Sequence, residues 1–495
     1  MATVYMDYAA TTPVDPRVAA AMTECLTPDG VFGNPASSHV YGVAAHARVE
    51  AARAQVAALI RAEARAIVWT SGATESNNLA LFGSARYRAD SGRHLVTART
   101  EHKSVLDPCK QLEKEGFEVT YLRPDRDGVV HPDAVAAALK ATTTLVSLMH
   151  VNNEIGVVQD IGAIGRLCHE RGVLFHVDAA QSAGKLEIDV ERQCIDLLSL
   201  TAHKLYGPKG IGALYVLRRP RIGLAPLLFG GGHEQGLRSG TLATHQIVGF
   251  GLACELAARE LGTEPTRIEA LRARLWNGLS KLGGVMPNGH PDARIAHVLN
   301  ASFEGVEGES LLSGLEDLAV SSGAACSSAT QEASYVLRAL GRSDALAQAS
   351  LRFSLGRFST EGDVDHAIAT VTREVTRLRR LSPATSDDWE RNGDADGQII
   401  GEAGSVDVGT WVRFAIGFDG GRVTEARFRA YGCPHTLAAA AWLAEHLRGR
   451  ALDDVLATGV QEVAARLGVP VEKLGRLLIV EDALRDCQRR ASRAV

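Results

Sequence analysis

A lysine stands at the end of a stretch of this sequence that has the pattern of a buried strand. The apolar run "DLLSL" is followed by Thr-Ala-His-Lys and then by a turn rich in glycine and proline, so Lys204 lies where the strand should end. A second apolar run, "LFHVD", ends at Asp178. Because neighbouring parallel strands bring their carboxyl ends to one edge of a sheet, we expect this amine and this carboxylate to lie close together. A lysine at a strand end is, taken by itself, more often a solvated rim residue.

A third segment has the pattern of an anion-binding site. The sequence "VWTSGATESNN" runs from an apolar strand through Ser-Gly-Ala-Thr into a predicted helix, which aims free backbone N–H groups at an anion such as phosphate. An amine, a carboxylate and a phosphate site together suit pyridoxal 5'-phosphate (PLP). This cofactor needs a lysine for its Schiff base, an acid at its ring nitrogen and an anchor for its phosphate. The three segments therefore predict a PLP site.

The elements that would position these groups alternate along the chain. Between residues 15 and 260, short β-branched apolar runs such as "RAIVWT", "TLVSLMHV" and "GVLFHVDAA" are separated by amphipathic helical stretches. This order predicts an α/β fold with a mostly parallel sheet flanked by helices. Residues 261–380 together with 1–14 are expected to form a smaller α+β domain, with "IAHVLNASF" and "ASLRFSLG" as strands.

The C-terminal part of the chain has a different character. Residues 381–404 are rich in Ser, Asp, Gly and Asn without apolar periodicity, which predicts a linker. Residues 405–495 are expected to form a third, compact α+β domain. Within it we expect a hairpin that turns at Asp-Gly-Gly, and helices over "TLAAAAWLAEHL" and "VEDALRDCQRR".

Composition limits the possible partners and compartments. A net charge of -5 over 495 residues gives no reason to expect binding to nucleic acid or to an anionic membrane. The N-terminal segment lacks the basic and apolar regions of a signal peptide, and no apolar run is long enough to span a bilayer. The 8 cysteines are sparse and include no Cys-x-x-Cys pair, so we expect a cytoplasmic protein without a disulfide framework.

Five long motifs resemble the cysteine desulfurases of the NifS/IscS type, and the likeness covers residues 3 to about 380. The motifs are "MHVNNEIGVVQDI", "FHVDAAQSAGKL", "HKLYGPKGIGALYV", "GGGHEQGLRSGT" and "SYVLRALG". The resemblance implies a fold-type-I PLP-dependent transferase, working as a homodimer with active sites near the subunit boundary.

The resemblance also assigns roles to individual residues. It implies that Lys204 bonds to PLP, that Asp178 pairs with the pyridine nitrogen and that His102 stacks on the ring. Asn153 and Gln181 would contact the ring substituents. The phosphate would be held by Ala73, Thr74, Thr201, His203 and, from the partner subunit, Thr241. Without the resemblance, the sequence would predict a packed core histidine at His102, a turn residue at Asn153 and a helix cap at Gln181.

The expected reaction converts L-cysteine to L-alanine. Cys326 lies in a run of Ser, Ala and Gly whose low bulk suggests a mobile loop, and the resemblance makes it the sulfur acceptor, forming a persulfide. Arg352 and Asn34 match residues expected to hold the substrate carboxylate, and the planar fork of arginine suits that task. Lys204 would remove the Cα proton, and His102 is the candidate for assisting with the thiol proton.

The third domain resembles the iron–sulfur scaffold proteins of the IscU type, from about Gly404 to Arg489. Such scaffolds hold a cluster through three cysteines and a nearby Asp or His, and thiolates are the usual ligands of these clusters. Here Cys433 alone matches; Val408-Gly409-Thr410 and Gly475-Arg476 stand where the other ligands would be. We therefore expect no metal site. Cys433 is either a second sulfur acceptor, favoured by the fusion of the two domains, or a buried packing residue. Docking of other carrier proteins is the alternative role of the domain.

Two other functions stay open on the sequence alone. One is a related PLP enzyme, such as a selenocysteine lyase. The other is a non-catalytic assembly platform, against which the intact set of Lys204, Asp178, His102 and Cys326 argues. The final recipient of the sulfur, whether an iron–sulfur assembly protein or another acceptor, is not specified by any motif.

Overall fold

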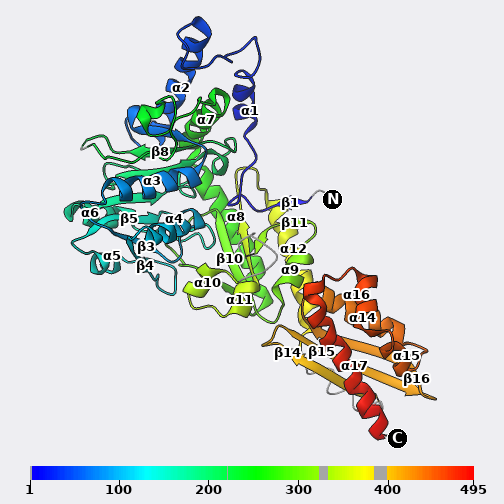
Figure 1. Ribbon diagram of the computed structural model, residues 1–495. Coiled ribbons are helices and arrows are strands. Elements are labelled where there is room, and N and C mark those ends of the chain that lie inside the picture. The colour runs from blue at the N-terminus through cyan, green and yellow to red at the C-terminus, as the bar shows by residue number, and fades with distance from the viewer. Residues whose placement is uncertain (1–2, 220, 323–332, 384–397, 495) are drawn as a thin grey trace.

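The chain folds into three parts that follow one another from the blue to the red end of Figure 1. The computed structural model describes residues 3–219, 221–322, 333–383 and 398–494. Residues from about 15 to 260 form a large sheet with helices. The following elements, joined by the N-terminal strand, form a smaller body beside it, and the C-terminal elements pack against that body. We call these parts the large domain, the small domain and the C-terminal domain.

The large domain is built on a seven-stranded sheet. In their order across the sheet the strands are β2 (Ile67–Thr70), β8 (Gly212–Val216), β7 (Leu197–Thr201), β6 (Leu174–Asp178), β5 (Thr143–Met149), β3 (His94–Ala98) and β4 (Glu118–Leu122). Strand β8 runs antiparallel to both of its neighbours, while β7, β6, β5, β3 and β4 are mutually parallel. The predicted parallel sheet is confirmed.

Alternate residues of these strands enter two separate hydrophobic cores. Leu174 packs in the core on one face of the sheet, and the next residue, Phe175, packs in the core on the other face. Helices cover both faces, so the strands read as continuous apolar runs. The helices of the large domain are α1 (Pro16–Thr23), α2 (Val40–Leu59), α3 (Ala73–Tyr87), α4 (Lys103–Lys114), α5 (Pro132–Ala138), α6 (Ile161–Glu170) and α7 (Thr244–Glu260).

The small domain is organised around an antiparallel sheet in the order β12 (Ser321–Ser322), β13 (Ser350–Ser354), β10 (Val298–Phe303), β9 (Val285–Pro287). Its helices are α8 (Glu264–Leu279), α9 (Gly308–Ser313), α10 (Tyr335–Ala339), α11 (Asp344–Gln348) and α12 (Glu361–Leu381). The N-terminal strand β1 (Val4–Tyr5) pairs with β11 (Leu318–Ala319), and Met6 enters the core of this domain. The N-terminal segment is thus held in the small domain, by residues that are far from it in the sequence.

The C-terminal domain consists of a three-stranded antiparallel sheet and helices on one side of it. The strands are β14 (Ile399–Ser405), β15 (Thr410–Asp419) and β16 (Arg422–Tyr431), and the helices are α14 (Pro434–Leu447), α15 (Leu452–Leu456), α16 (Gly459–Leu467) and α17 (Leu474–Ala494). The predicted hairpin turns at Gly420 and Gly421, both with positive φ. The remaining strand of this domain, β14, is not predicted by the sequence, because residues 399–404 have the composition of a linker.

The physical reason for that error lies in two glycines. Strand β14 pairs along its whole length with β15 and packs against α17. A Cβ on Gly401 would approach the backbone nitrogen of Cys487 to 2.4 Å, and Gly404 has a φ of 77°. The close helix and the backbone conformation require glycine at these positions, so the segment has the composition of a linker. Residues 384–397 lie outside the described part of the chain.

Among the residues described, none of the helices combines the length and the apolar character needed to cross a lipid bilayer.

Candidate active site at the carboxyl edge of the large sheet

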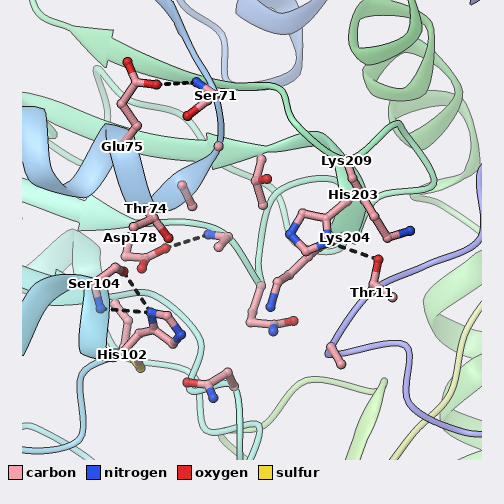
Figure 2. Close-up of a pocket in the computed structure, with 18 of the residues that line it drawn as sticks. Thr11, Ser71, Thr74, Glu75, His102, Ser104, Asp178, His203, Lys204 and Lys209 are labelled. Atoms are coloured by element: carbon pink, nitrogen blue, oxygen red, sulfur yellow. Dashed lines mark hydrogen bonds between the residues drawn. The ribbon is translucent and has the colours of Figure 1, made fainter. Parts of the chain in front are cut away.

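A cavity of about 600 Å³ opens where the parallel strands of the large sheet end. This volume is within the range of small-molecule sites. Figure 2 shows Lys204 projecting into the cavity, with Asp178 and His102 on the other side in this view. The lining includes Ala73, Thr74, His102, Asn153, Asp178, Gln181, Thr201, His203 and Lys204.

Lys204 is positioned by the end of strand β7. A single 3₁₀ turn, Ala202–Lys204, follows the strand and directs the side chain into the cavity. Its Nζ donates a hydrogen bond to the carbonyl oxygen of Ala9 at 2.8 Å. Burial first, and then the positive charge of Arg352, lower the pKa of Lys204 to about 8. The amine therefore loses its proton far more readily than a solvated lysine.

Asp178 ends the neighbouring strand, β6, and is buried with both oxygens bonded. Its Oδ2 accepts a hydrogen bond from Nδ2 of Asn77 at 2.8 Å, and its Oδ1 accepts from the backbone N–H of Ala180 at 2.9 Å. These two donors fix the orientation of the carboxylate. The geometry fits an acid whose task is to accept a hydrogen bond from a protonated ring nitrogen.

His102 caps the first turn of α4 and stands on the same network. Its Nδ1 accepts from the backbone N–H of Ser104 at 3.1 Å and lies 2.8 Å from the Ser104 hydroxyl, which in turn accepts from Asn77. Because Nδ1 is an acceptor, the proton of the neutral ring is on Nε2. Burial lowers the pKa of His102, which favours this neutral form. His102 thus offers a donor at Nε2 to the cavity.

The start of α3 forms the anion-binding end of the cavity. No side chain caps this helix, so the N–H groups of Ala73 and Thr74 stay free for a ligand. The one acidic side chain in its first turn, Glu75, is turned away and bonds Ser71 and Arg238. Gly212 of β8 packs closely behind the loop, where a Cβ would lie 2.6 Å from Cα of Gly72.

His203 and Thr201 complete that end. Nδ1 of His203 lies 3.1 Å from the Thr11 hydroxyl, as Figure 2 shows. Burial first, and then the charge of Lys204, lower the pKa of His203 to about 4, so its ring is neutral. The Thr201 hydroxyl lies close to the open space beside Gly72.

Asn153 and Gln181 lie on the remaining walls. The Asn153 side-chain oxygen is buried without a partner among the described residues, whereas the side-chain oxygen of the preceding Asn152 accepts from the backbone N–H groups of Glu154 and Ile155. Gln181 donates to the same Ala9 carbonyl that Lys204 uses, at 2.8 Å.

The sequence did not predict the role of this Ala9 carbonyl, nor those of Asn77 and Ser104. Only Asn77 gave a signal: it lies one helical turn after Thr74 and so faces the same way.

Arg352 lies in strand β13, beside the cavity and outside its lining. Its Nη2 donates to Asp7 at 2.7 Å and to the Ser321 hydroxyl at 3.1 Å, while Nη1 donates to the carbonyl oxygen of Asn153 at 2.9 Å. Its Nε is buried and unbonded among the described residues. Ser321 belongs to β12, the last described strand before residues 323–332. Cys326 lies in that segment, outside the described residues.

Two predicted residues are not brought to the cavity within one chain. Asn34 and Thr241 are both exposed and neither belongs to the lining. Asn34 instead uses its side-chain oxygen to accept from the backbone N–H of Ala36.

In the C-terminal domain, Cys433 is fully buried at the N-terminus of α14, with its Sγ 3.5 Å from the Thr436 hydroxyl. Val408, which stands where a scaffold protein would have its first cluster ligand, is exposed. Within the part of the chain that the structure covers, no group of three His, Cys, Asp or Glu side chains could hold a metal ion.

Residues 4–366 match the sequence profile of the family described as Aminotransferase class-V. The chain belongs to the aminotransferase class-V family. Residues 388–489 match a second profile, the NifU-like N terminal domain; we therefore refer to the C-terminal domain as the NifU-like domain.

Relatives of this class-V family member include "Cysteine desulfurase IscS" of Shewanella sp. (strain ANA-3), 58% identical over 388 residues, which are 78% of this chain and 95% of that protein. Among solved structures, a "NIFS-LIKE PROTEIN" superimposes with a TM-score of 0.71 at 34% identity, covering 76% of this chain and all of that one. "SspA in complex with cysteine" superimposes with a TM-score of 0.65 at 39% identity, covering 72% and 100%.

Class-V aminotransferases and cysteine desulfurases depend on PLP, and the cavity of this family member fits the cofactor. The uncapped start of α3 suits the phosphate, and the doubly bonded Asp178 suits the ring nitrogen. The unpartnered oxygen of Asn153 suits a polar ring substituent. Each group faces one cavity that contains the amine of Lys204.

Proposed function

We propose that this protein is a PLP-dependent cysteine desulfurase that converts L-cysteine to L-alanine and takes the sulfur as a persulfide on Cys326. The observation that carries the proposal is the convergence of Lys204, Asp178 and His102 on one cavity beside Arg352. The identity to proteins named cysteine desulfurase and the likeness to a structure with bound cysteine support the choice of substrate.

The residues proposed to hold PLP have separate tasks. Ala73, Thr74, Thr201 and His203 would bind the phosphate, Asn153 and Gln181 would contact the ring substituents, and Asp178 would keep the ring nitrogen protonated. Bound PLP supplies an aldehyde that engages amines and a ring that accepts the electrons released at the substrate Cα. The Nε2–H of His102 lies where it can donate toward the cofactor.

Lys204 is the proposed base for the Cα proton. With its pKa lowered to about 8, a substantial fraction of the amine is unprotonated near neutral pH. Its bond to the Ala9 carbonyl places a fixed acceptor behind the amine and so orients it toward the cavity. An ordinary solvated lysine, with a pKa of about 10.4, would be almost entirely protonated at the same pH.

Arg352 is the proposed partner of the substrate carboxylate. Its guanidinium is held on three sides by Asp7, Ser321 and Asn153, which leaves little freedom to lose when the substrate binds. Asn34 would assist only if another chain or a rearrangement brings it to the cavity.

Sulfur transfer would use the Cys326 thiolate. The thiolate attacks the sulfur of the substrate, an S–S bond forms, the Cβ–S bond breaks, and the carbon fragment takes up protons and leaves as alanine. His102 is neutral with its proton on Nε2 and its Nδ1 used as an acceptor, so it can donate a hydrogen bond from Nε2 toward the reacting sulfur. A neutral His102 in this tautomer has no free ring nitrogen with which to remove the thiol proton.

We further propose a cytoplasmic homodimer in which Thr241 of the partner subunit completes the phosphate site. Several large apolar side chains in and around α1 and α2 stand exposed, which supports an interface there: Leu26, Phe32, Tyr41 and Val43. No membrane or nucleic-acid partner is proposed. The sulfur would pass to iron–sulfur assembly or another acceptor, consistent with the NifU-like domain.

Cys433 is the proposed second acceptor within the chain. Because its thiol is fully buried, transfer to it requires a change in the position or packing of the NifU-like domain. Mass spectrometry after turnover decides this point: added sulfur on Cys326 and none on Cys433 would leave Cys433 a packing residue.

The test of the main proposal is turnover of L-cysteine by the purified, PLP-loaded protein in the presence of a reductant. We expect alanine and sulfide in equal amounts. Lys204→Ala should abolish both products, and Cys326→Ala should abolish sulfide release while the protein still binds PLP. Cys25→Ala is the matched control and should be fully active. Full activity in Cys326→Ala would reject the acceptor, and a preference for selenocysteine alone would favour the lyase alternative.

A further inference from the structure

The NifU-like domain packs against α9 and α12 of the small domain. The hydroxyl of Ser310, in α9, donates to the carbonyl oxygen of Gly432 at 2.8 Å, and this bond is buried. Beside it, the Tyr431 hydroxyl donates to the carbonyl oxygen of Val306 at 3.4 Å. Both bonds use the two residues that precede Cys433, so the end of β16 and the start of α14 lie directly on α9 (Figure 1).

Charged and apolar contacts surround this pair of bonds. Nζ of Lys473 forms an ion pair with Glu309 at 2.7 Å, and both side chains are more than three-quarters buried. Ion pairs that are shielded from water are screened less by salt than exposed ones. Leu437 of α14 packs against the core of the small domain and also against that of its own domain.

Arg476 lies at the same edge and joins segments that would otherwise be separate. Its Nη1 donates to the carbonyl oxygen of Gly409 at 2.7 Å and to the Thr410 hydroxyl at 2.9 Å, which ties the start of α17 to the start of β15. Burial raises the pKa of Glu307, the N-cap of α9, and the charge of Arg476 counteracts that rise. The guanidinium therefore also attracts the small domain.

A guanidinium at this position has a chemical consequence. Arginine carries only donors and a permanent positive charge, so it binds carbonyl and hydroxyl oxygens and repels metal cations. The edge with Val408, Gly475 and Arg476 has lost the thiolate and imidazole ligands that an iron–sulfur site requires. Its polar contacts are made instead within the chain.

We propose that this edge of the NifU-like domain is a joint to α9 of the chain's own small domain, closed by Ser310 and by the Lys473–Glu309 pair, with Arg476 bracing the NifU-like side of the joint instead of a metal centre. The partner of the surface is thus the same polypeptide, and the docked arrangement is the one that the protein adopts in solution. The domain then covers α9 in the resting protein, and sulfur transfer to the enclosed Cys433 requires this joint to open.

Zero-length cross-linking of the full-length protein tests the joint directly. A carbodiimide converts a contacting carboxylate and amine into an amide, so an amide between Lys473 and Glu309 should be found by mass spectrometry. The Lys140–Glu118 pair of the large domain is the internal positive control. Mixing ¹⁵N-labelled with unlabelled protein separates cross-links within one chain from those between chains. Failure of the Lys473–Glu309 link while Lys140–Glu118 forms, or links between chains only, would overturn the proposal.

A charge-reversal cycle provides the second measurement. Glu309→Lys should raise hydrogen exchange of the α9 amides and of residues 433–437 by about fivefold, and Glu309→Lys combined with Lys473→Glu should restore the wild-type rates. Glu462→Lys, which disrupts the exposed pair with Arg466 in the same domain, should leave these rates unchanged. Unchanged exchange in Glu309→Lys would contradict the joint. PLP binding is expected to be normal in all three variants, which separates this test from that of the proposed function.

Discussion

Asn77 donates a hydrogen bond from Nδ2 to Oδ2 of Asp178 over 2.8 Å, with both side chains buried. The same Nδ2 donates to the Ser104 hydroxyl, whose own contact is Nδ1 of His102. One amide therefore fixes both the acid proposed to pair with the ring nitrogen and the histidine proposed to stack on the ring. Neither partner can move without breaking a bond in a buried environment, where an unpaired polar group is costly.

The amide of Asn77 should therefore govern cofactor affinity. Asn77→Ala removes a hydrogen bond to a charged group, and we expect the Kd for PLP to rise about tenfold to a hundredfold. Titration of the apoprotein with PLP, followed by absorbance, measures this change. Asn78→Ala is the matched control, because that amide bonds only backbone carbonyls. Equal affinities of the two variants would show that Asn77 does not support Asp178.

The lowered pKa of Lys204 predicts a pH dependence that can be measured without the cofactor. In the apoprotein, acylation of Lys204 should rise with pH and reach half its maximum near pH 8, because only the unprotonated amine reacts. Arg352→Gln removes a positive charge and leaves Asp7 unneutralised, so both effects raise the pKa and move the midpoint upward. Quantitative mass spectrometry of the peptide with Lys204 gives the midpoint. A midpoint near the ordinary value of about 10.4 would disprove the effect of burial.

A serine cap should control the order of the helix that follows the segment of Cys326. Ser334 caps α10 through the N–H of Leu337 and also donates to Glu154 at 2.5 Å; burial raises the pKa of Glu154 to about 7. Loss of a cap costs about 1 kcal/mol, so Ser334→Ala should raise hydrogen exchange in α10 about fivefold.

Ser343→Ala offers a matched control for that change. Ser343 caps α11 in the same way, through the N–H of Leu346, and does not contact Glu154 in the described structure. Replacement of Ser343 should raise hydrogen exchange in α11, and it should leave both hydrogen exchange in α10 and sulfur release unchanged. If Ser343→Ala affected α10 as strongly as Ser334→Ala does, the effect would be a general loss of stability in the small domain.

Gly212 should be essential to the phosphate end of the cavity. A Cβ at this position would lie 2.5 Å from the Leu200 carbonyl and 2.6 Å from Cα of Gly72. Gly212→Ala must therefore displace the loop that leads into α3, and we expect PLP to bind at least about tenfold more weakly. Gly362→Ala, where the new Cβ meets no atom closer than 3.7 Å, should bind PLP as the wild type does. Normal binding by Gly212→Ala would mean that the loop tolerates the shift.

The sequence allowed the large sheet and the positions of Lys204 and Asp178 to be predicted, because strands buried on both faces leave long apolar runs. Strand β4 was missed since it lies at the edge and is only partly buried. Strand β14 was missed because its glycines serve close packing. These errors arise where tertiary contacts, and not local composition, decide the structure.

The same distinction applies to the site. Lys204 and Asp178 could be predicted because each lies at the end of a strand. Ala73 and Thr74 could be predicted because they lie at the start of a helix. The bonds among Asn77, Ser104 and His102 depend on how two helices meet, which no local pattern encodes. The carbonyl of Ala9 carries no side-chain signal at all. The burial of Cys433 likewise follows from its surroundings in the folded NifU-like domain, and not from the residues beside it in the sequence.

The attachment of the N-terminal segment has a consequence for biosynthesis. Ala9 supplies the acceptor for Lys204, yet its backbone nitrogen is held by Ser354, and Asp7 is paired with Arg352. Residues 7–9 must therefore wait for strand β13, which is synthesised much later, before they can take their final place. Nascent chains arrested before that strand should fail to retain the coenzyme, so loading must be a late event in the maturation of each polypeptide.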